Sequence, residues 1–399
     1  MKILVVSSLY PPHVIGGYEL GCRDVVEALR ARGHVVHVLT SSYGLERPAR
    51  QGHVARVLQS EIGWNFAAPA TGLRLFWKEV HNRRAIRQAL AMFRPDLVYV
   101  WSLQNISLTP IMFAQQTGVP VVFYSSDEWL AHWAQRDRWL QVPPDPLRRV
   151  AKRTLNMAAN TLGGRVEARL DLANVECTST YIRDAFAQAG RPLERAQVIH
   201  WGIDLGRFPY RAAVRPQRTR LLYVGQVIAH KGVHTAVAVV EQFGRLGIDA
   251  TLTVVGRAAS AAYQQQLEAL ACGGAGRVRF AGVVPRERLA EIYAAHDILI
   301  FPSVWQEPFS ITLLEALASG LAVVSTATGG TPEILTHGHN ALLFAPEDVG
   351  GCVAQVAQLA GDAVQYERIR ACGRATVEQG FQLEQMVEKI EQHLKQVIA

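Results

Sequence analysis

The sequence predicts an α/β protein of two domains, each built on a parallel β-sheet with helices on both faces. Three observations support this prediction. The 399 residues exceed what one hydrophobic core usually holds. Short apolar runs rich in Val, Ile and Leu alternate with longer segments of helical periodicity, as in sheets buried on both faces. The same alternation starts again after a Pro- and Arg-rich segment, 208–220.

The first domain is expected to span residues 1–207. A β-rich run at 3–7 leads through a Pro- and Gly-bearing loop into a helix that Gly33 ends. The segment at 43–72 is predicted to be irregular. The other predicted elements alternate along the chain: strand 35–42, helix 73–93, strand 95–102, helix 109–117, strand 120–126, a basic helical region 146–173, strand and helix 175–190, and strand 197–204.

The second domain is expected to span residues 221–380, after a linker at 208–220, and a closing helix is expected at 381–399. The predicted strands begin with TRLLYVGQ and continue with DATLTVVG, RVRFAGVV, DILIFPS and LAVVSTATGG. Helical patterns follow the first of these strands and the loop at 303–310. The two halves therefore repeat one architecture without a measurable sequence repeat.

Composition favours a folded protein in a reducing compartment. Hydrophobic residues make up 49% and charged residues 19%, as in globular proteins. The five cysteines are odd in number and scattered, with no close pair for zinc or redox exchange. The N-terminal apolar run is too short for a signal peptide, and no run of about 18 apolar residues occurs elsewhere. We expect a cytoplasmic protein, with peripheral contact at the inner face of the membrane left open.

The net charge of +7 permits attraction to anions, but it does not indicate which kind of anion the protein binds. The basic residues lie in patches interleaved with apolar ones, such as Arg83, Arg84 and Arg87, or Arg148, Arg149, Lys152 and Arg153. Such patches are typical of the solvated faces of amphipathic helices, and peripheral membrane contact is the alternative. Nucleic acid is not an expected partner.

Three loops at carboxyl ends of strands carry candidate chemistry, because ligands of doubly wound sheets bind there. In the loop at 303–310, Glu307 precedes a helix and Glu315 lies on its second turn. The backbone N–H groups of Phe309, Ser310 and Ile311 are predicted to bind phosphate at the helix N-terminus. Carboxylates accept hydrogen bonds from vicinal hydroxyls, so the combination predicts a nucleotide sugar. Two solvated glutamates are the simpler interpretation, although the apolar neighbours of Glu315 argue against it.

The other two loops add cations and glycines. Lys231 follows the strand that ends in Gly225 and Gln226, and it is placed to meet a diphosphate. Gly16 and Gly17 precede the first helix and offer a second phosphate contact. Taken singly, a surface lysine and a Gly-Gly pair are weak signals.

The chain resembles glycosyltransferase family 4, on the GT-B fold, over nearly its whole length. The resemblance rests on the order of several motifs: GGYE, VIHWGID, VGQ followed by KG, the pair Glu307 and Glu315 at E-x7-E spacing, and TGGTPEIL with HGHNALLF behind it. It implies two Rossmann-like domains whose parallel sheets face across a cleft, and a C-terminal helix returning to the first domain. It also implies transfer of a hexose from a nucleotide diphosphate sugar, UDP or GDP, to a hydroxyl of a glycan, lipid-linked or small-molecule acceptor.

The resemblance also implies roles for individual residues. In such enzymes the first glutamate contacts the transferred sugar and the second the ribose, which maps to Glu307 and Glu315. The lysine that binds the diphosphate maps to Lys231. The glycine loop, which lies against phosphates or acceptor, maps to Gly16 and Gly17.

Two positions depart from the pattern of the family. A frequent Gly-Arg pair is Gly225-Gln226 here, which leaves charge stabilisation to Lys231, to helix N–H groups and to another arginine such as Arg257. A frequent His-Asp pair is replaced by Ser126-Asp127, so only Asp127 carries over, as an acceptor-side or sugar-side catalytic group. The nucleobase is expected to contact backbone near Val283 and Val284.

Similar enzymes retain the anomeric configuration and use neither a metal ion nor a cofactor. The sequence lacks an Asp-x-Asp pair of the kind that holds a divalent ion on a diphosphate. Lys231 and the helix N-terminus are therefore expected to stabilise the departing diphosphate, which itself accepts the proton of the acceptor hydroxyl. Glu307 is expected to bind sugar hydroxyls, with covalent nucleophile as the alternative role.

Other classes remain as rivals. A nucleotide-sugar epimerase or a phosphorylase shares the fold, and a non-catalytic carbohydrate- or nucleic-acid-binding protein is the alternative outside enzymes. A dinucleotide oxidoreductase expects G-x-G-x-x-G spacing, which Gly16, Gly17 and Gly21 do not have, and the P-loop signature is absent. The tryptophans and arginines of 129–153 border the acceptor cleft in one interpretation and pack between helices in another.

Overall fold

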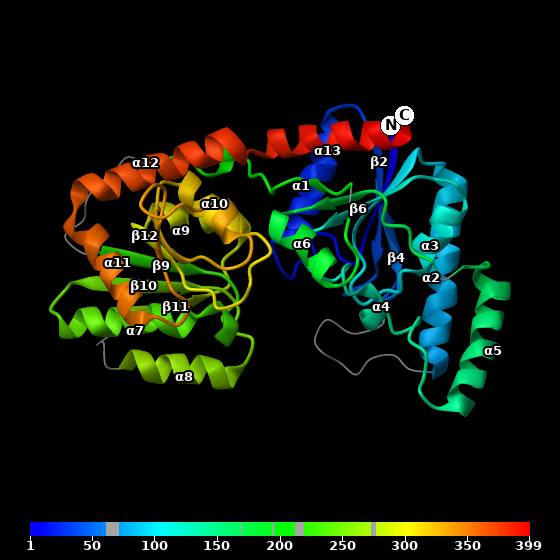
Figure 1. The fold of residues 1–399 in the computed structure, drawn as a ribbon, viewed down its shortest axis with the longest axis horizontal. Coiled ribbons are helices and arrows are strands. Elements are labelled where there is room, and N and C mark those ends of the chain that lie inside the picture. The colour runs from blue at the N-terminus through cyan, green and yellow to red at the C-terminus, as the bar shows by residue number, and fades with distance from the viewer. Residues whose placement is uncertain (61–71, 168, 194, 212–218, 273–276) are drawn as a thin grey trace. The chain divides into compact units, whose positions relative to one another are not determined.

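The computed structural model describes residues 1–399 except 61–71, 168, 194, 212–218 and 273–276. The described chain divides into two compact units (Figure 1), of which unit 1 comprises Met1–Ile199 and Val387–Ala399 and unit 2 comprises His200–Met386. Much of the predicted linker, at 212–218, lies outside the described residues. The predicted domain boundaries stay predictions. No helix in the described ranges is both long and apolar enough to cross a membrane.

Unit 1 contains an eight-stranded sheet in the order β3-β4-β2-β1-β5-β6-β7-β8. All neighbouring strands run parallel except β3 and β4, which pair antiparallel. The central strands are continuously apolar because helices cover both faces, and every residue of β5 is buried. The strands are β1 (Lys2–Ser7), β2 (Val35–Ser41), β3 (Ala49–Gln51), β4 (Val54–Leu58), β5 (Leu97–Ser102), β6 (Val121–Ser125), β7 (Val175–Cys177) and β8 (Gln197–Val198).

The helices of unit 1 follow the apolar spacing of the sequence. In α1 the residues at helical spacing, Val25, Val26 and Leu29, are buried against the sheet. Helix α5 begins where the side chain of Asp145 accepts a hydrogen bond from the N–H of Arg148. The helices are α1 (Gly17–Ala31), α2 (Gly72–Phe93), α3 (Thr109–Gln116), α4 (Trp133–Arg136), α5 (Pro146–Gly163) and α6 (Thr180–Gln188).

Two predictions for the first half were wrong in detail. Part of the stretch predicted to be irregular, 43–72, forms the hairpin of β3 and β4, in which Val54, Arg56 and Leu58 are buried and alternate with the half-buried Ala55 and Val57. The helix predicted at 146–173 ends at Gly163, since the chain leaves helical geometry at Gly164, whose φ is 105°.

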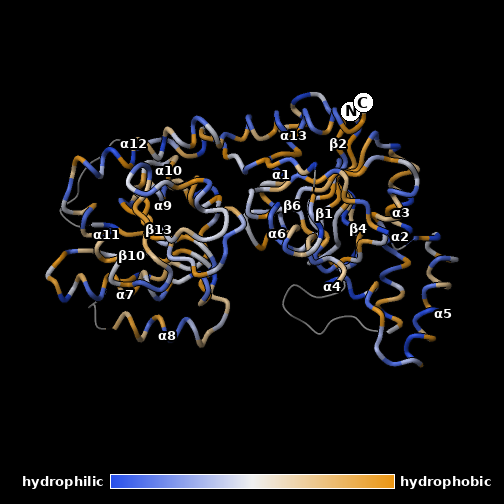
Figure 2. The backbone as a smooth tube through the Cα atoms, viewed as in Figure 1, coloured by the Kyte–Doolittle hydropathy of each residue, from blue (hydrophilic) through white to orange (hydrophobic). Residues whose placement is uncertain are grey.

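Unit 2 contains a six-stranded sheet, parallel throughout, in the order β11-β10-β9-β12-β13-β14. The strand order reverses between β9 and β12, which is the switch point of a doubly wound sheet. Figure 2 shows the hydrophobic colours concentrated on the strands. The strands are β9 (Thr219–Val224), β10 (Ala250–Val255), β11 (Val278–Gly282), β12 (Ile298–Phe301), β13 (Ala322–Thr326) and β14 (Leu342–Phe344).

The helices of unit 2 pack on this sheet around one apolar core. That core joins buried residues of β9, β10, β12 and β13 to the inner faces of the helices α7 and α11. Helix α10 is buried along most of its length. It corresponds to the helix predicted after the loop at 303–310. The helices are α7 (Val233–Arg245), α8 (Ala261–Ala271), α9 (Leu289–Ala294), α10 (Ile311–Ala318), α11 (Val349–Gly361) and α12 (Ala363–Gly380).

The C-terminal helix, α13 (Leu383–Ile398), begins in unit 2 and from Val387 belongs to unit 1, as predicted. His393 Nδ1 lies 2.7 Å from Oε1 of the fully buried Glu176. The hydroxyl of Tyr99 donates a hydrogen bond to the other oxygen of that carboxylate. Glu391 pairs with Arg32 and His34, which follow directly after α1. Buried polar contacts thus anchor the last turns of the chain.

Candidate functional site

Each sheet presents loops at its switch point, where the strand order reverses. In unit 2 the loop after β9 holds Lys231 in a short 3₁₀ turn, Ala229–Lys231, and the loop after β12 holds Glu307. In unit 1 the corresponding loops follow β1 and β5. Because the carboxyl ends of adjacent parallel strands lie together, residues 75 or more positions apart meet in these loops.

Lys231 and Glu307 form an ion pair. Nζ of Lys231 donates hydrogen bonds to Oε1 and Oε2 of Glu307, at 2.7 and 2.8 Å. Ser303 also donates to Oε1. Glu307 is 4% exposed, so its charge needs these partners. Each carboxylate oxygen accepts more than one hydrogen bond, and Oε2 therefore retains capacity for a ligand hydroxyl.

The two loops that carry the pair are fixed to each other through their backbones. The carbonyl of His230 accepts hydrogen bonds from the N–H groups of Val304 and Trp305, at 2.9 and 3.0 Å. Gly232 has a φ of 68°, and a Cβ there would lie 1.9 Å from the carbonyl oxygen of Pro302. Gly232 therefore lets its loop approach the protein's own backbone, and this close approach sets the position of Lys231.

A third loop supports Glu307 from the side of β13. The N–H of Gly330 donates to the carbonyl of Glu307 at 2.7 Å. A Cβ at Gly329, whose φ is 57°, would lie 2.2 Å from the same oxygen. Sequence reasoning used the motif TGGTPEIL only as a mark of resemblance and missed this function. The Gly-Gly pair at the end of a predicted strand could have indicated this close backbone contact.

The N-terminus of α10 lies directly after Glu307. Ser310 is the N-cap residue, and its side chain does not cap the helix. Among the described residues, no acceptor receives the backbone N–H groups of Phe309, Ser310 or Ile311. These groups and the helix dipole create positive potential suited to an anion, and the phosphate contact expected there stays a prediction.

Phe309 is held in place by two motifs from elsewhere in unit 2. The ring of His200 stacks on that of Phe309 with a centroid distance of 5.3 Å. Nε2 of His200 lies 2.8 Å from a carboxylate oxygen of Glu333. The segments VIHWGID and TGGTPEIL thus meet beside α10, which sequence spacing alone did not indicate.

Glu315 lies on α10 and is buried. The hydroxyl of Tyr293 donates to its Oε2 at 2.9 Å, and Arg286 Nη1 lies 3.5 Å from Oε1. Burial, and then the charge of Glu315, raise the pKa of Tyr293 well above its usual value, so the phenol stays protonated and donates. Neither Tyr293 nor Arg286 was singled out from the sequence. Arg286 supplies a cation at the carboxyl edge of β11.

The remaining predicted donor residues lie on the same edge but are not joined to the pair by side-chain contacts among the described residues. Gly225 has a φ of 155° and packs against Gly256, and the carbonyl of Gln226 accepts from the hydroxyl of Tyr223. The side chains of Gln226, Arg257 and Val283 are exposed.

In unit 1 the glycine loop already has a hydrogen-bond partner from its own helix. Gly16 is the N-cap of α1, and its N–H donates to Oε2 of Glu19 at 3.0 Å. A carboxylate therefore already occupies this helix N-terminus, although Gly17 begins the helix where predicted. A phosphate at Gly16 and Gly17 would have to displace that contact.

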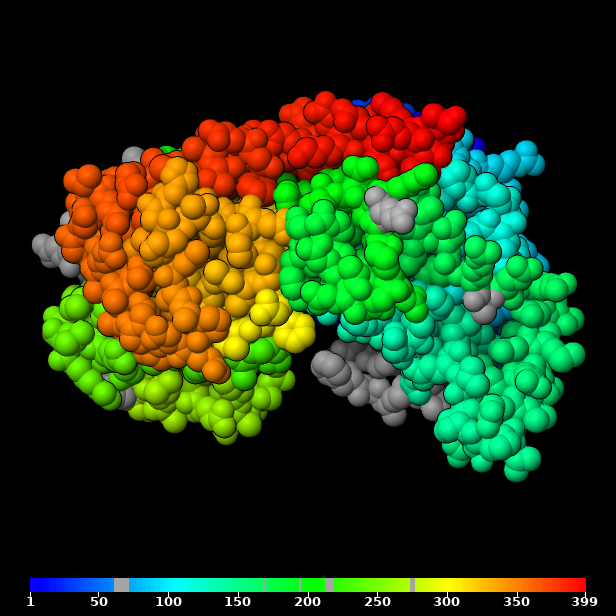
Figure 3. All heavy atoms as spheres, in the orientation of Figure 1, coloured from blue at the N-terminus to red at the C-terminus, as the bar shows by residue number. Residues whose placement is uncertain are grey.

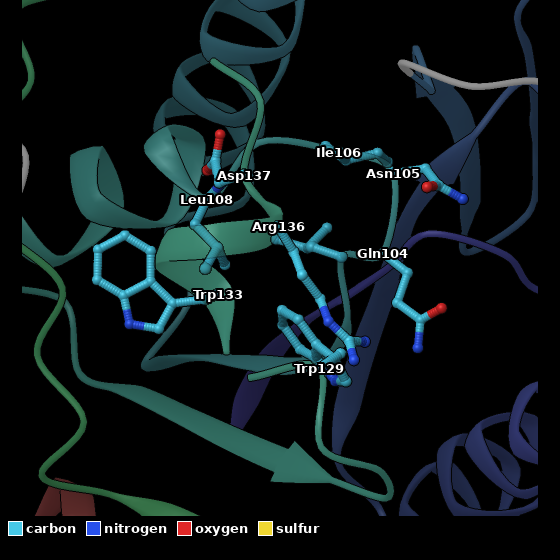
Figure 4. A pocket seen from close by; sticks show the side chains of 9 residues that line it. Gln104, Asn105, Ile106, Leu108, Trp129, Trp133, Arg136 and Asp137 are labelled. Carbon is cyan, nitrogen blue, oxygen red and sulfur yellow. The ribbon is translucent and has the colours of Figure 1, made fainter. Parts of the chain in front are cut away.

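Asp127 also has partners, and two of them line a cavity. Gln104 Nε2 donates to Oδ2 at 2.6 Å, and the N–H of Trp129 donates to Oδ1 at 2.7 Å. Burial raises the pKa of Asp127. Gln104 and Trp129 belong to a cavity of about 280 Å³ (Figure 4), lined by Leu103, Gln104, Asn105, Ile106, Leu108, Trp129, Trp133, Arg136 and Asp137. Sequence analysis noted the tryptophans but not the loop after β5.

In the described part of the chain, no group of three or more His, Cys, Asp or Glu side chains is placed to hold a metal ion.

Comparison with known families covers most of the chain. The model of the Glycosyltransferase Family 4 matches residues 15–207, and the model of the glycosyl transferases group 1 matches residues 210–376. Glycogen synthase of Mycobacterium tuberculosis is 27% identical, over 96% of this chain and 91% of that protein. The Sulfoquinovosyl transferase SQD2 of Arabidopsis thaliana is 24% identical, over 91% of this chain and 68% of that protein.

Solved structures share the fold. Sucrose-phosphate synthase from Thermosynechococcus elongatus superposes with a TM-score of 0.75 at 20% identity, covering 99% of this chain and 98% of that one. Anabaena Alr3699/HepE in complex with UDP and glucose superposes with a TM-score of 0.72 at 20% identity, covering 99% and 100%. The chain is therefore a glycosyltransferase of the GT-B fold and belongs to the family 4 type.

Proposed function

We propose that this glycosyltransferase moves a hexose from a nucleoside diphosphate sugar to a hydroxyl acceptor, with retention of configuration and without a metal ion. The observation that carries the proposal is the ion pair of Lys231 and Glu307 beside the N-terminus of α10. It combines a cation and free N–H groups for phosphates with a carboxylate for sugar hydroxyls.

The donor is expected to lie across the switch point of unit 2. Lys231 and the N–H groups of Phe309, Ser310 and Ile311 bind the diphosphate. Glu307 accepts hydrogen bonds from the hexose, and Glu315 from the ribose. Gly225, Gln226 and Arg257 border the phosphates, and backbone near Val283 contacts the base. Uridine is the first base to test, because solved structures of similar fold contain UDP or UDP-glucose.

The reaction breaks the bond between the anomeric carbon and the diphosphate oxygen. The electron pair leaves with the diphosphate, and Lys231 and the helix N-terminus stabilise the resulting negative charge. The acceptor oxygen bonds to the anomeric carbon on the same face. Its proton passes to an oxygen of the departing phosphate, so no protein base is required for that step.

The acceptor is expected on the side of unit 1, where Gly16 and Gly17 follow the loop after β1 and Asp127 lies on the loop after β6. The cavity of unit 1 is large enough for one sugar ring, and the faces of Trp129 and Trp133 suit its apolar side. Gln104 and Asn105 supply amide groups for hydroxyls.

We also propose that the protein works in the cytoplasm. The described cysteines, Cys22, Cys177, Cys272, Cys352 and Cys372, are all free thiols. Free thiols fit a reducing compartment.

The donor is identified first by a thermal-shift screen of UDP-, GDP- and ADP-sugars, since a ligand that binds only the folded state raises the melting temperature. The product is then analysed by NMR for its anomeric configuration. Retention supports the proposal, and inversion would contradict it. Conversion of the donor sugar without any acceptor would indicate an epimerase instead.

A further inference from the structure

Unit 1 carries an exposed apolar and basic surface that contains none of the residues proposed for catalysis. Helices α2 and α5 lie side by side and begin at the same end of unit 1 (Figure 1). We call the surface around their first turns the α2–α5 patch. Its exposed apolar side chains are Leu73, Trp77, Val142, Leu147, Val150 and Met157.

The outward face of α5 is apolar where a surface helix is usually polar. Leu147, Val150 and Met157 are 81%, 61% and 71% exposed. At 100° per residue they lie on one side of the helix, opposite Ala159 and Gly163, which are buried toward α2. Figure 3 shows residues 146–163 at the surface of unit 1. Core packing therefore does not explain these three side chains.

The charges of the same helix all have one sign. Helix α5 contains four basic side chains, those of Arg148, Arg149, Lys152 and Arg153, and no acidic one. The nearest acid, Asp145, caps the helix by accepting from the N–H of Arg148. Within the described ranges, the guanidinium groups of Arg148 and Arg153 form no ion pair with protein carboxylates. Their charge remains available to an anionic partner.

The inner side of α5 is fixed firmly enough to present this face. Arg83 of α2 donates to the side chain of Asn160 at 2.8 Å, and Arg84 donates to the carbonyl of Leu162. Near the other end, Nζ of Lys152 lies 3.5 Å from the ring centroid of Trp139. The patch is therefore a preformed surface of a packed helix pair.

We propose that the α2–α5 patch binds the surface of a bilayer that contains anionic lipid. The apolar side chains enter the boundary between headgroups and acyl chains, and the arginines remain at the phosphate level. A second copy of the chain fits less well, because a symmetric contact would bring the four cations of each α5 against those of the other. Nucleic acid would use the cations but leave the apolar residues in water.

The test is co-sedimentation of the full chain with vesicles of phosphatidylcholine alone or with about one third phosphatidylglycerol. We expect binding to the anionic vesicles and weak binding to the neutral ones. The variant Leu147→Glu with Met157→Glu should lower the partition coefficient at least tenfold. The variant Arg148→Ala with Arg153→Ala should lower it roughly fivefold for each arginine removed.

Matched substitutions in unit 2 provide the controls. Val364→Glu replaces a side chain that is 80% exposed, and Arg245→Ala removes an exposed cation. Both should bind vesicles like the unaltered protein. Circular dichroism and donor hydrolysis should be unchanged in all variants, since none of these residues belongs to the proposed donor site. Vesicle binding and sugar transfer can therefore fail independently.

Two outcomes would overturn the proposal. One is absence of binding to anionic vesicles by the unaltered chain, or equal binding by the Leu147→Glu, Met157→Glu variant. The other is concentration-dependent dimerisation, measured by light scattering, that this variant abolishes while vesicles are not bound. That result would assign the patch to an interface between two copies.

Discussion

The loops at the carboxyl edges of the two sheets differ in how their charged and polar groups are paired. In unit 2, Lys231 and Glu307 come from separate loops and neutralise each other across the edge of the sheet. In unit 1, the N–H of Gly16 donates to Glu19, three residues along the chain, and Asp127 accepts from the N–H of Trp129 and from Gln104 of the loop after β5. One unit presents a charged pair and an open helix N-terminus, and the other presents a cavity between aromatic and amide side chains. The fold is shared, but the chemistry that its loops offer is not.

This difference assigns separate tasks to the two units. A preorganised pair of opposite charges suits a donor that carries both phosphates and hydroxyls. A partly aromatic cavity with amide groups and the guanidinium of Arg136 suits an acceptor that must be positioned rather than activated. Substitutions in unit 2 should therefore affect the chemical step, and substitutions in unit 1 should affect recognition of the acceptor.

The largest effect is expected at the ion pair. Lys231→Ala and Glu307→Ala should each lower the turnover rate by at least ~100-fold, which is typical of one lost electrostatic contact with a transition state. The double variant should be little worse than either single one, because the two side chains act as a unit. The measurement is the turnover rate at saturating donor and acceptor.

Lys389→Ala serves as the control, because Lys389 is an exposed lysine of α13. It should transfer sugar at the normal rate. Near-normal transfer by either Lys231→Ala or Glu307→Ala, with the fold intact, would remove the pair from the site.

The next effect is expected at the glycine that places Lys231. Gly232→Ala should lower the free energy of unfolding by about 2 kcal/mol more than Gly247→Ala. Both glycines have positive φ, of 68° and 74°, but only at Gly232 would a Cβ meet backbone. Chemical denaturation of the two variants measures the difference. Equal stabilities would mean that the loops carrying the pair are not held together at Pro302.

A smaller, more selective effect is expected in the cavity of unit 1. Arg136→Ala should raise the KM for the acceptor roughly tenfold, about the loss of one hydrogen bond to a charged group. The KM for the donor should not change, because Arg136 lines only the cavity of unit 1. Steady-state kinetics with each substrate varied in turn separates the two constants, and Arg183→Ala on α6 is the surface control. A change in the KM for the donor alone would contradict the assignment of acceptor binding to unit 1.

The smallest effect concerns the anchoring of α13 to unit 1. The hydrogen bond from Lys395, followed by those from Arg32 and His34, lowers the pKa of Glu391 to about 2. A lowered carboxyl pKa contributes stability above pH ~4.5, which is lost as the pH falls toward 2. Glu391→Gln should therefore reduce the free energy of unfolding by about 1 kcal/mol at pH 6 and by less at pH 3. A difference that did not shrink with acid would exclude this pair as the cause.

Much of the fold followed from the sequence, because buried parallel strands are continuous apolar runs that helical periods separate. The hairpin of β3 and β4 was missed, since its strands are short and β4 carries the buried Arg56 between Val54 and Leu58, which interrupts the apolar pattern. The helix at 146–173 was overextended, because charged residues continue beyond Gly163 and hide its end.

The candidate site was predictable where the chain places a group directly after a strand. Lys231, Glu307 and the start of α10 all follow strand ends, so strand order alone brings them to one edge. The partners of these groups were not predictable. Tyr293 and Arg286 reach Glu315, and Gly330 reaches Glu307, through tertiary packing that no local pattern encodes.

The most direct test of the account is calorimetric titration of the full chain with UDP and with UDP-glucose, or with the nucleotide pair that the screen selects. Lys231→Ala should weaken the binding of both ligands at least tenfold, because both carry the diphosphate. Glu307→Gln should weaken only the sugar nucleotide and should bind the diphosphate at least as tightly, because it frees Lys231 from its partner. Unchanged binding by Lys231→Ala, or equal losses for both ligands in Glu307→Gln, would contradict the assignment of the diphosphate to the lysine and of the sugar to the glutamate.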